Sequence, residues 1–182
     1  MAGPKLCTDI VDVYVFRRPH AGCRLGGTQF LQMRRATGQM ASTWQPVMGH
    51  VKPGETAAAA ALRELGEETR FGPAPGDHLL GLWQIESINM YFLATRDVIM
   101  LTACFAAQVD ASAEPTLDEA HDGHRWVNRD RADRHFIWPG QRAAIDQITR
   151  DILSADSPVQ AVLRIDPVTV ALPPARHTCK PY

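Results

Sequence analysis

The order of apolar and polar residues along the chain predicts a sheet with helices packed against it. Two early segments alternate and are rich in β-branched residues, which indicates a hairpin of strands at 10–16 and 28–34. Three later runs predict strands at 79–88, 98–109 and 124–127. Residues 89–97 either extend the first of these runs or form a loop.

A helix is predicted to follow Thr56, which is a suitable N-cap for the alanine run that begins at Ala57. At about 100° per residue, one face of this helix should pack on the sheet. That face holds Ala58, Leu62, Leu65 and Thr69. The opposite and flanking arc holds Glu64, Glu67 and Glu68.

A second helix is predicted at 141–153, because Pro139 suits a helix start and apolar residues follow at helical spacing. This helix should cover the other face of the sheet. Residues 1–6 are expected to be a loose leader and 159–165 a further strand, followed by a proline-containing tail at 167–182. We therefore expect one domain at 1–158, with 159–182 belonging to the same domain or to a dimer contact.

The acidic cluster on the first predicted helix calls for a compensating positive charge. Glu64 and Glu68 are four residues apart, and like charges at that spacing destabilise a helix by a few tenths of a kcal/mol. A divalent cation held by carboxylate oxygens would compensate them. The alternative is a solvated acidic face, which is the usual role of glutamates on a helix.

The spacing of Gly49, Glu55 and the run Arg63-Glu64-Leu65-Gly66-Glu67-Glu68 resembles the signature of the Nudix hydrolases. This resemblance implies an α/β fold, an α/β/α sandwich with a mixed central sheet. It also implies an enzyme that hydrolyses a phosphoanhydride bond with Mg²⁺, or alternatively Mn²⁺. An acidic cluster repels a polyphosphate, so a metal between them is what the chemistry needs.

The same resemblance assigns roles to individual residues. The metal ligands would be Glu64, Glu67 and Glu68, together with the carbonyl group of Gly49. Arg63 would pair with Glu55 and brace the loop against the helix. The family usually has a glycine where this chain has Arg70, so the helix either ends there in a strained conformation or continues to Gly72.

The approach segment Trp44-Gln45-x-Val47-x-Gly49 resembles one branch of the family, the dihydroneopterin triphosphate pyrophosphatases, which also hydrolyse nucleoside triphosphates. That branch has a Glu-His pair shortly before a tryptophan, and its glutamate helps to bind metal or to activate water. His121 and Trp126 match, but Ala120 replaces the glutamate. Glu119 or Asp122 could supply the missing carboxylate, and either Glu68 or Glu119 could act as the base.

The favoured substrate is therefore a nucleoside triphosphate or dihydroneopterin triphosphate, cleaved with release of pyrophosphate. A dinucleoside polyphosphate, ADP-ribose and a catalytically silent nucleotide-binding domain are the alternatives. Arg34 could contact phosphate, although a solvated loop edge explains it equally well. Trp83 or Tyr91 could stack on the ring of the substrate, although core packing explains each of them singly.

Composition narrows the classes of partner. The 182 residues carry a formal net charge of -1, which argues against a long nucleic acid as substrate. The four cysteines form no CxxC pair and are expected to be reduced thiols. No apolar run is long enough for a membrane helix, so we expect a cytoplasmic protein, for which a homodimer is compatible with the family.

Overall fold

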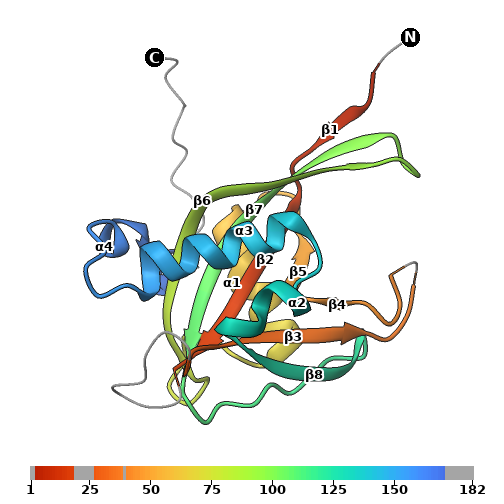
Figure 1. The fold of residues 1–182 in the computed structure, drawn as a ribbon. Helices are drawn as coiled ribbons and strands as arrows, with labels where there is room; N and C mark the ends of the chain where they lie inside the picture. The colour runs from red at the N-terminus through yellow and green to blue at the C-terminus, as the bar shows by residue number, and fades with distance from the viewer. Residues whose placement is uncertain (1–2, 19–26, 39, 171–182) are drawn as a thin grey trace.

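The computed structural model describes residues 3–18, 27–38 and 40–170, and within them a nine-stranded mixed sheet forms the centre of the molecule (Figure 1). Strands β2 and β7 run parallel in the middle, with β3 antiparallel to β2 and β6 antiparallel to β7. Strand β5 pairs antiparallel with the start of β2, and β8 with β3. The strands are β1 (Lys5–Cys7), β2 (Ile10–Arg17), β3 (Gln29–Arg35), β4 (Trp44–Gln45), β5 (Val47–His50), β6 (Leu79–Leu93), β7 (Val98–Val109), β8 (His121–Asn128) and β9 (Arg164–Ile165).

Helices cover both faces of this sheet, so the α/β/α sandwich with a mixed central sheet is confirmed. In Figure 1, α3 crosses the front of the sheet and α1 lies behind it. Alternation along β2 creates the two cores: Val11, Val13 and Val15 pack on the α1 side, and Tyr14 and Phe16 on the α3 side. The helices are α1 (Ala57–Thr69), α2 (Ala132–His135), α3 (Pro139–Ile148), α4 (Gln160–Leu163) and α5 (Pro167–Val170), with a 3₁₀ turn at Arg129–Arg131 and a π-helical extension of α3 at Thr149–Leu153.

The predicted strands at 10–16, 28–34, 79–88 and 98–109 and both predicted helices are present, with small shifts of their ends. Strand β6 continues to Leu93, and β8 already begins at His121. Two predictions are wrong. Residues 160–163 form the helix α4 and leave only a two-residue strand, and part of the expected leader forms β1 beside β7. The tail at 171–182 lies outside the described residues.

Asp12 is a charged residue inside the core on the α3 side of the sheet. Its side chain is completely buried, and burial raises its pKa to about 6. The Oδ2 atom accepts two long hydrogen bonds, 3.5 Å from the Tyr14 hydroxyl and 3.4 Å from Asn89 Nδ2. The Oδ1 atom has no partner among the described residues.

Replacing Asp12 by asparagine should stabilise the protein above pH 6 and have little effect below pH 4. The folded pKa of about 6 lies above the ordinary value of 3.8, so ionisation at neutral pH opposes folding. The shift corresponds to about 3 kcal/mol at most, using about 1.4 kcal/mol per pKa unit. Urea unfolding of both proteins at pH 4 and pH 8 measures the difference, and equal gains at the two pH values would contradict the prediction.

Helix α1 ends at Thr69, because Arg70 adopts a left-handed conformation with φ 65° and donates its backbone N–H to the Gly66 carbonyl. The helix thus ends at Arg70 in a strained conformation and does not continue to Gly72. An arginine in this conformation is strained by contact of its Cβ with the backbone, whereas glycine would not be. The helix therefore ends where a glycine would end it, although this position holds an arginine.

Replacing Arg70 by glycine should accordingly stabilise the protein by about 1 kcal/mol, since relief of strain outweighs the greater freedom of glycine in the unfolded chain. The shift in the urea unfolding midpoint at constant slope measures this gain. A loss of stability would mean that the Arg70 side chain makes contacts worth more than the backbone strain.

Candidate functional site

Helix α1 carries the acidic cluster, and its packing gives each glutamate a different environment. Thr56 is the N-cap, with its hydroxyl accepting a 3.1 Å hydrogen bond from the Ala59 backbone N–H, as predicted. Ala60, Ala61 and Leu65 are buried against the sheet. This orientation turns Glu68 inward, so that it is only 7% exposed, while Glu67 faces solvent. Glu68 thus lies on the buried side of the helix and not on the outer arc.

Arg63 connects the loop before α1 to the acidic cluster. Its guanidinium donates to both oxygens of Glu55, at 2.9 and 3.0 Å, and to the carbonyl of His50 at 2.8 Å. It also donates to Glu64 at 2.6 Å and to Glu67 at 3.0 Å. A bidentate contact of this kind fixes orientation as well as charge. The expected bracing pair of Arg63 and Glu55 is therefore present.

Gly49 lets the Glu64 carboxylate lie directly against strand β5. A Cβ atom at Gly49 would overlap the carboxyl carbon of Glu64. Gly49 is paired with Val11 of β2 and faces α1. The lack of a side chain at Gly49 thus creates the space that the carboxylate occupies, and it brings the Glu64 oxygens beside the β5 backbone.

Glu68 is held against the same strand, because its Oε2 accepts a 3.3 Å hydrogen bond from the backbone N–H of Met48. Burial, and then the nearby charges of Glu64 and Asp118, raise the pKa of Glu68 to about 8. A positive charge at this point would favour the ionised carboxylate. The electrostatics of the site therefore suit a cation.

Asp118 is the further carboxylate at this site, and the sequence did not single it out. The loop that carries it is attached to the end of α1 by a hydrogen bond from the Thr116 N–H to the Thr69 carbonyl. Asp118 Oδ1 lies 2.8 Å from Nδ1 of His121, whose side chain is buried. The spacing of Asp118 and His121 in the sequence is the one signal that could have indicated it.

The two carboxylates that the sequence offered for this role lie elsewhere. Glu119 is exposed to solvent. Asp122 is also exposed, and it accepts a 2.7 Å hydrogen bond from Nε of Arg34. The carboxylate that contacts His121 is instead Asp118, which lies two residues before Ala120 and one residue before Glu119.

The three residues predicted to bind substrate do not gather in one place. Trp83 is 5% exposed and packs in the core under α3, so its role is that of a core aromatic. Arg34 lies on β3 and pairs with Asp122. Tyr91 is half-buried on β6, near enough to Asp12 for that carboxylate to contribute to a raised pKa of Tyr91, after the larger effect of burial.

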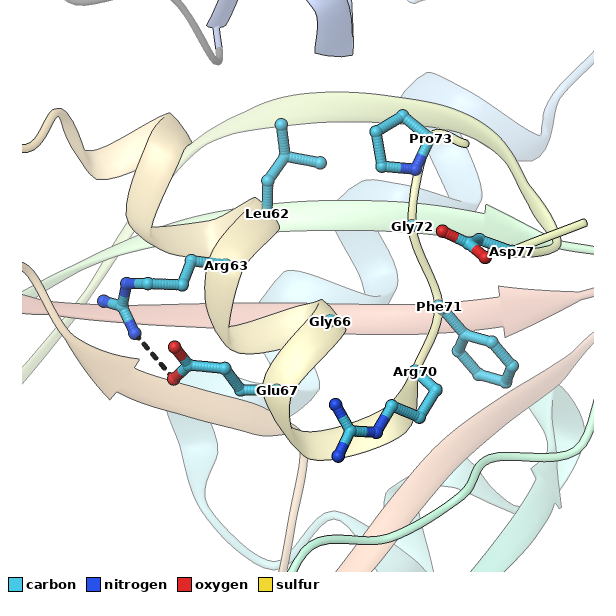
Figure 2. Close-up of a pocket in the computed structure, with 9 residues that line it drawn as sticks. All are labelled: Leu62, Arg63, Gly66, Glu67, Arg70, Phe71, Gly72, Pro73 and Asp77. Carbon is cyan, nitrogen blue, oxygen red and sulfur yellow. Dashed lines mark hydrogen bonds and ion pairs between the residues drawn. The ribbon is translucent and has the colours of Figure 1, made fainter. Parts of the chain in front are cut away.

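A hollow of about 410 Å³ lies on the outer side of α1 (Figure 2). Arg63 and Glu67 form one end of it, joined by the ion pair drawn as a dashed line, and Pro73 and Asp77 lie at the other end. Glu64 and Glu68 are not among the residues that line it. The hollow is therefore a neighbour of the acidic site and not the place where its carboxylates meet.

The donor set fits a divalent cation such as Mg²⁺ or Mn²⁺. All the candidate ligands are oxygens, which these hard ions prefer: the carboxylates of Glu64, Glu67 and Glu68 and the carbonyl of Gly49. In the part of the chain that the structure describes, no three acidic or histidine side chains converge on one point, and Arg63 binds Glu64 and Glu67 instead. Glu64 and Glu67 would have to turn from Arg63 toward Glu68 to hold the ion.

Comparison with known proteins agrees with this fold. The NUDIX domain family matches residues 15–148, and the chain therefore belongs to the Nudix family. Rat bis(5'-nucleosyl)-tetraphosphatase (asymmetrical) is 30% identical over 89 residues, which cover 49% of this chain and 58% of the rat enzyme. The matched part thus spans little more than half of that relative's length.

Among the solved structures that resemble the fold are two hydrolases of nucleotide-like substrates. A Caenorhabditis elegans Ap4A hydrolase in a binary complex has a TM-score of 0.61 at 18% identity, covering 79% of this chain and 95% of that one. The Escherichia coli dihydroneopterin triphosphate pyrophosphohydrolase has a TM-score of 0.58 at 20% identity, covering 81% and 97%. At these identities the likeness concerns the fold.

Two expectations from composition can be compared with the described residues. None of the helices in that part of the chain is long and apolar enough to cross a membrane. Cys7 and Cys104 are free thiols, while Cys23 and Cys179 lie outside the described residues.

Proposed function

We propose that the protein hydrolyses a phosphoanhydride bond in a nucleoside triphosphate or in dihydroneopterin triphosphate, releasing pyrophosphate, with Mg²⁺ or Mn²⁺ as cofactor. The observation that carries the proposal is that Glu64 and Glu68 both lie against the Met48–Gly49 backbone of β5, with Asp118 near enough for its charge to raise the pKa of Glu68. Such a set of oxygens suits a cation that in turn binds phosphate.

In this mechanism the carboxylates of Glu64, Glu67 and Glu68 and the Gly49 carbonyl would hold the cation. A divalent cation, when bound, neutralises phosphate charge and makes an attacking water more acidic. The water oxygen attacks phosphorus, the bond to the departing phosphate oxygen breaks, and a carboxylate accepts the proton of the water. Glu68 and Asp118 are the two candidates for this base. Arg63 keeps the loop fixed through Glu55 throughout.

The alternative substrates are a dinucleoside polyphosphate or ADP-ribose, and the alternative to catalysis is nucleotide binding alone. The rat relative and the C. elegans structure are named for hydrolysis of dinucleoside polyphosphates, which favours keeping that substrate class. The presence of all three glutamates of the signature favours catalysis over binding alone.

A substrate panel tests the proposal. The eight common NTPs and dNTPs, dihydroneopterin triphosphate, ADP-ribose and a diadenosine polyphosphate are incubated with Mg²⁺, and pyrophosphate and phosphate are measured separately. Release of pyrophosphate from a triphosphate supports the proposal. Turnover of ADP-ribose or the dinucleotide alone would replace the substrate, and nucleotide binding without any turnover would replace the function.

Asp118→Asn should lower kcat about 10-fold to 100-fold, whereas Glu119→Gln should change it less than about twofold. Asp118 contacts His121 and its charge acts on Glu68, while Glu119 is exposed to solvent. The magnitude is that expected for groups that support metal ligands. Steady-state kinetics of the two variants side by side decide between the neighbouring carboxylates, and a larger effect at Glu119 would restore the role that the sequence suggested for it.

The remaining predictions concern partners and compartment. We propose that Arg34 leaves its ion pair with Asp122 and contacts a phosphate group of the substrate. We also propose that no long nucleic acid is a substrate. The cytoplasmic location and the homodimer stay predictions from the sequence, as does the single domain at 1–158. Trp83 is not part of the proposed substrate site, since its ring is buried in the core.

A further inference from the structure

A second group of polar side chains is buried at the start of α3, on the face of the sheet opposite the carboxylates. Three of its members carry an oxygen without a hydrogen-bond partner within the described part of the chain: Oδ1 of Asp12, Oγ1 of Thr102 and Oε1 of Gln141. They come from β2, β7 and α3, and all three residues are buried. Unpaired buried oxygens are costly, so this group is suited to a ligand that supplies donors.

Asn89 links Asp12 to the first turn of α3. Its Nδ2 donates to Asp12, while its Oδ1 lies so close to Gly140 that a Cβ there would overlap it. The helix has no side-chain cap at Trp138. The first backbone N–H groups of α3 form the positive end of the helix dipole, and no side chain caps them. Asn89 lies beside this end of the helix.

Asn89 lies between the buried Asp12 side chain and the surface of the protein. It is half-buried, and its hydrogen bond to Asp12 is 3.4 Å long, beyond the usual range for an N–H···O bond. Tyr91, two residues further along β6, is half-buried, and Trp138, the N-cap residue of the helix whose Gly140 lies beside Asn89, is half-exposed. Rotation of one amide side chain would therefore open Asp12 to a flat ring lying beside these aromatic residues.

The chemistry of Asp12 selects among flat rings. A carboxylate is a double acceptor, so it pairs best with two adjacent N–H donors. Guanine offers a ring N–H beside an amino group, and a pterin ring has the same 2-amino-4-oxo-pyrimidine edge. Adenine and cytosine place an acceptor beside their amino group, and uracil and thymine flank their N–H with acceptors. Only the first two rings match.

We propose that Asp12 binds the 2-amino-4-oxo-pyrimidine edge of a guanine or pterin ring, with Gln141 as a further acceptor. This proposal rests on the proposed function, because Met48 connects the two sites. Its backbone N–H donates to Glu68, and Met48 itself lies opposite Asp12 in the pairing of β5 with β2. A ring at Asp12 would thus lie one strand away from the carboxylates but on the other face of the sheet, with its phosphates passing around the edge of the sheet at β5.

Inosine nucleotides test the pairing, because inosine lacks only the 2-amino group. With Mg²⁺, we expect kcat/KM to fall at least about 10-fold from GTP to ITP, the worth of one hydrogen bond to a charged group, and further for ATP. In Asp12→Asn the preference for GTP over ITP should shrink to within about threefold. Asp9→Asn is the matched control: it makes the same change at an exposed carboxylate just before β2, and the preference should survive.

Binding without catalysis separates this inference from the proposed function. Calorimetry in EDTA with GMP and IMP should show tighter binding of GMP by the wild-type protein and by Asp9→Asn, and no difference in Asp12→Asn. If triphosphates are hydrolysed but GTP and ITP are treated alike, or Asp12→Asn keeps the preference, the inference is wrong and the function stands. If nothing is hydrolysed but GMP binding depends on Asp12, the function is wrong and the inference stands.

Discussion

Replacing Glu68 by glutamine is expected to lower kcat by about 10²-fold to 10⁴-fold, the range for loss of a catalytic acid or base. Glutamine has the same shape and can still accept the hydrogen bond from Met48, so the position of the helix should not change. What is lost is the negative charge that a cation and a proton both need. Burial already raises the pKa of Glu68 to about 8, so removing its charge should not destabilise the fold.

The control for this prediction is Glu67→Gln on the same helix. Glu67 is exposed, and Lys52 and Arg63 already balance its charge, so we expect a smaller loss of kcat. Magnesium titration of both variants should show a weaker apparent affinity for Glu68→Gln. A Glu68→Gln variant that retained more than about a tenth of wild-type kcat would exclude Glu68 as the base and leave Asp118 in that role.

The acidic site was largely predictable because its parts lie within one continuous segment. Helical spacing and the turn before α1 determine where Glu55, Arg63 and Glu64 fall relative to one another, and the structure shows them in contact. Helical spacing alone did not reveal that Glu68 turns inward. That orientation depends on how far Leu65 sinks into the sheet, which is a property of the tertiary packing.

Asp118 and Trp83 show why the rest was not predictable. The position of Asp118 depends on the hydrogen bond between Thr116 and Thr69, a contact across 47 residues of sequence that no local pattern indicates. Trp83 lies before a register shift in β6 between Gln84 and Ile88. Such an irregularity breaks the simple alternation of faces along a strand, so aromatic residues on its two sides cannot be placed from the sequence alone.

The buried polar group around Asp12 could not be predicted from the sequence for a related reason. In the pattern of β2, Asp12 stands between Val11 and Val13 as an ordinary polar residue of a half-exposed strand. It becomes a buried carboxylate only because α3 covers that face of the sheet. The acidic site therefore depends on a local sequence motif, whereas the group around Asp12 depends on the packing of α3 against the sheet.

Replacing Gly49 by alanine is expected to lower kcat about 100-fold while changing the free energy of unfolding little. The new Cβ would overlap the Glu64 carboxyl group, which must then leave the β5 backbone. The overlap is with the end of a flexible side chain, so the fold can adjust by moving that side chain. A displacement of about 1 Å in a catalytic group can cost about 10²-fold in rate.

Gly66→Ala provides the matched control for this substitution. A Cβ at Gly66 meets only the Phe71 carbonyl at an ordinary distance of 3.7 Å, and alanine favours the helix by up to about 1 kcal/mol. We expect that variant to keep its activity and to gain stability. Kinetics and urea unfolding of both variants separate loss of the carboxylate position from loss of the fold. If Gly49→Ala were as active as the wild type, catalysis would not require Glu64 to lie against β5, and the proposed ligand set would lose that carboxylate together with its geometric basis.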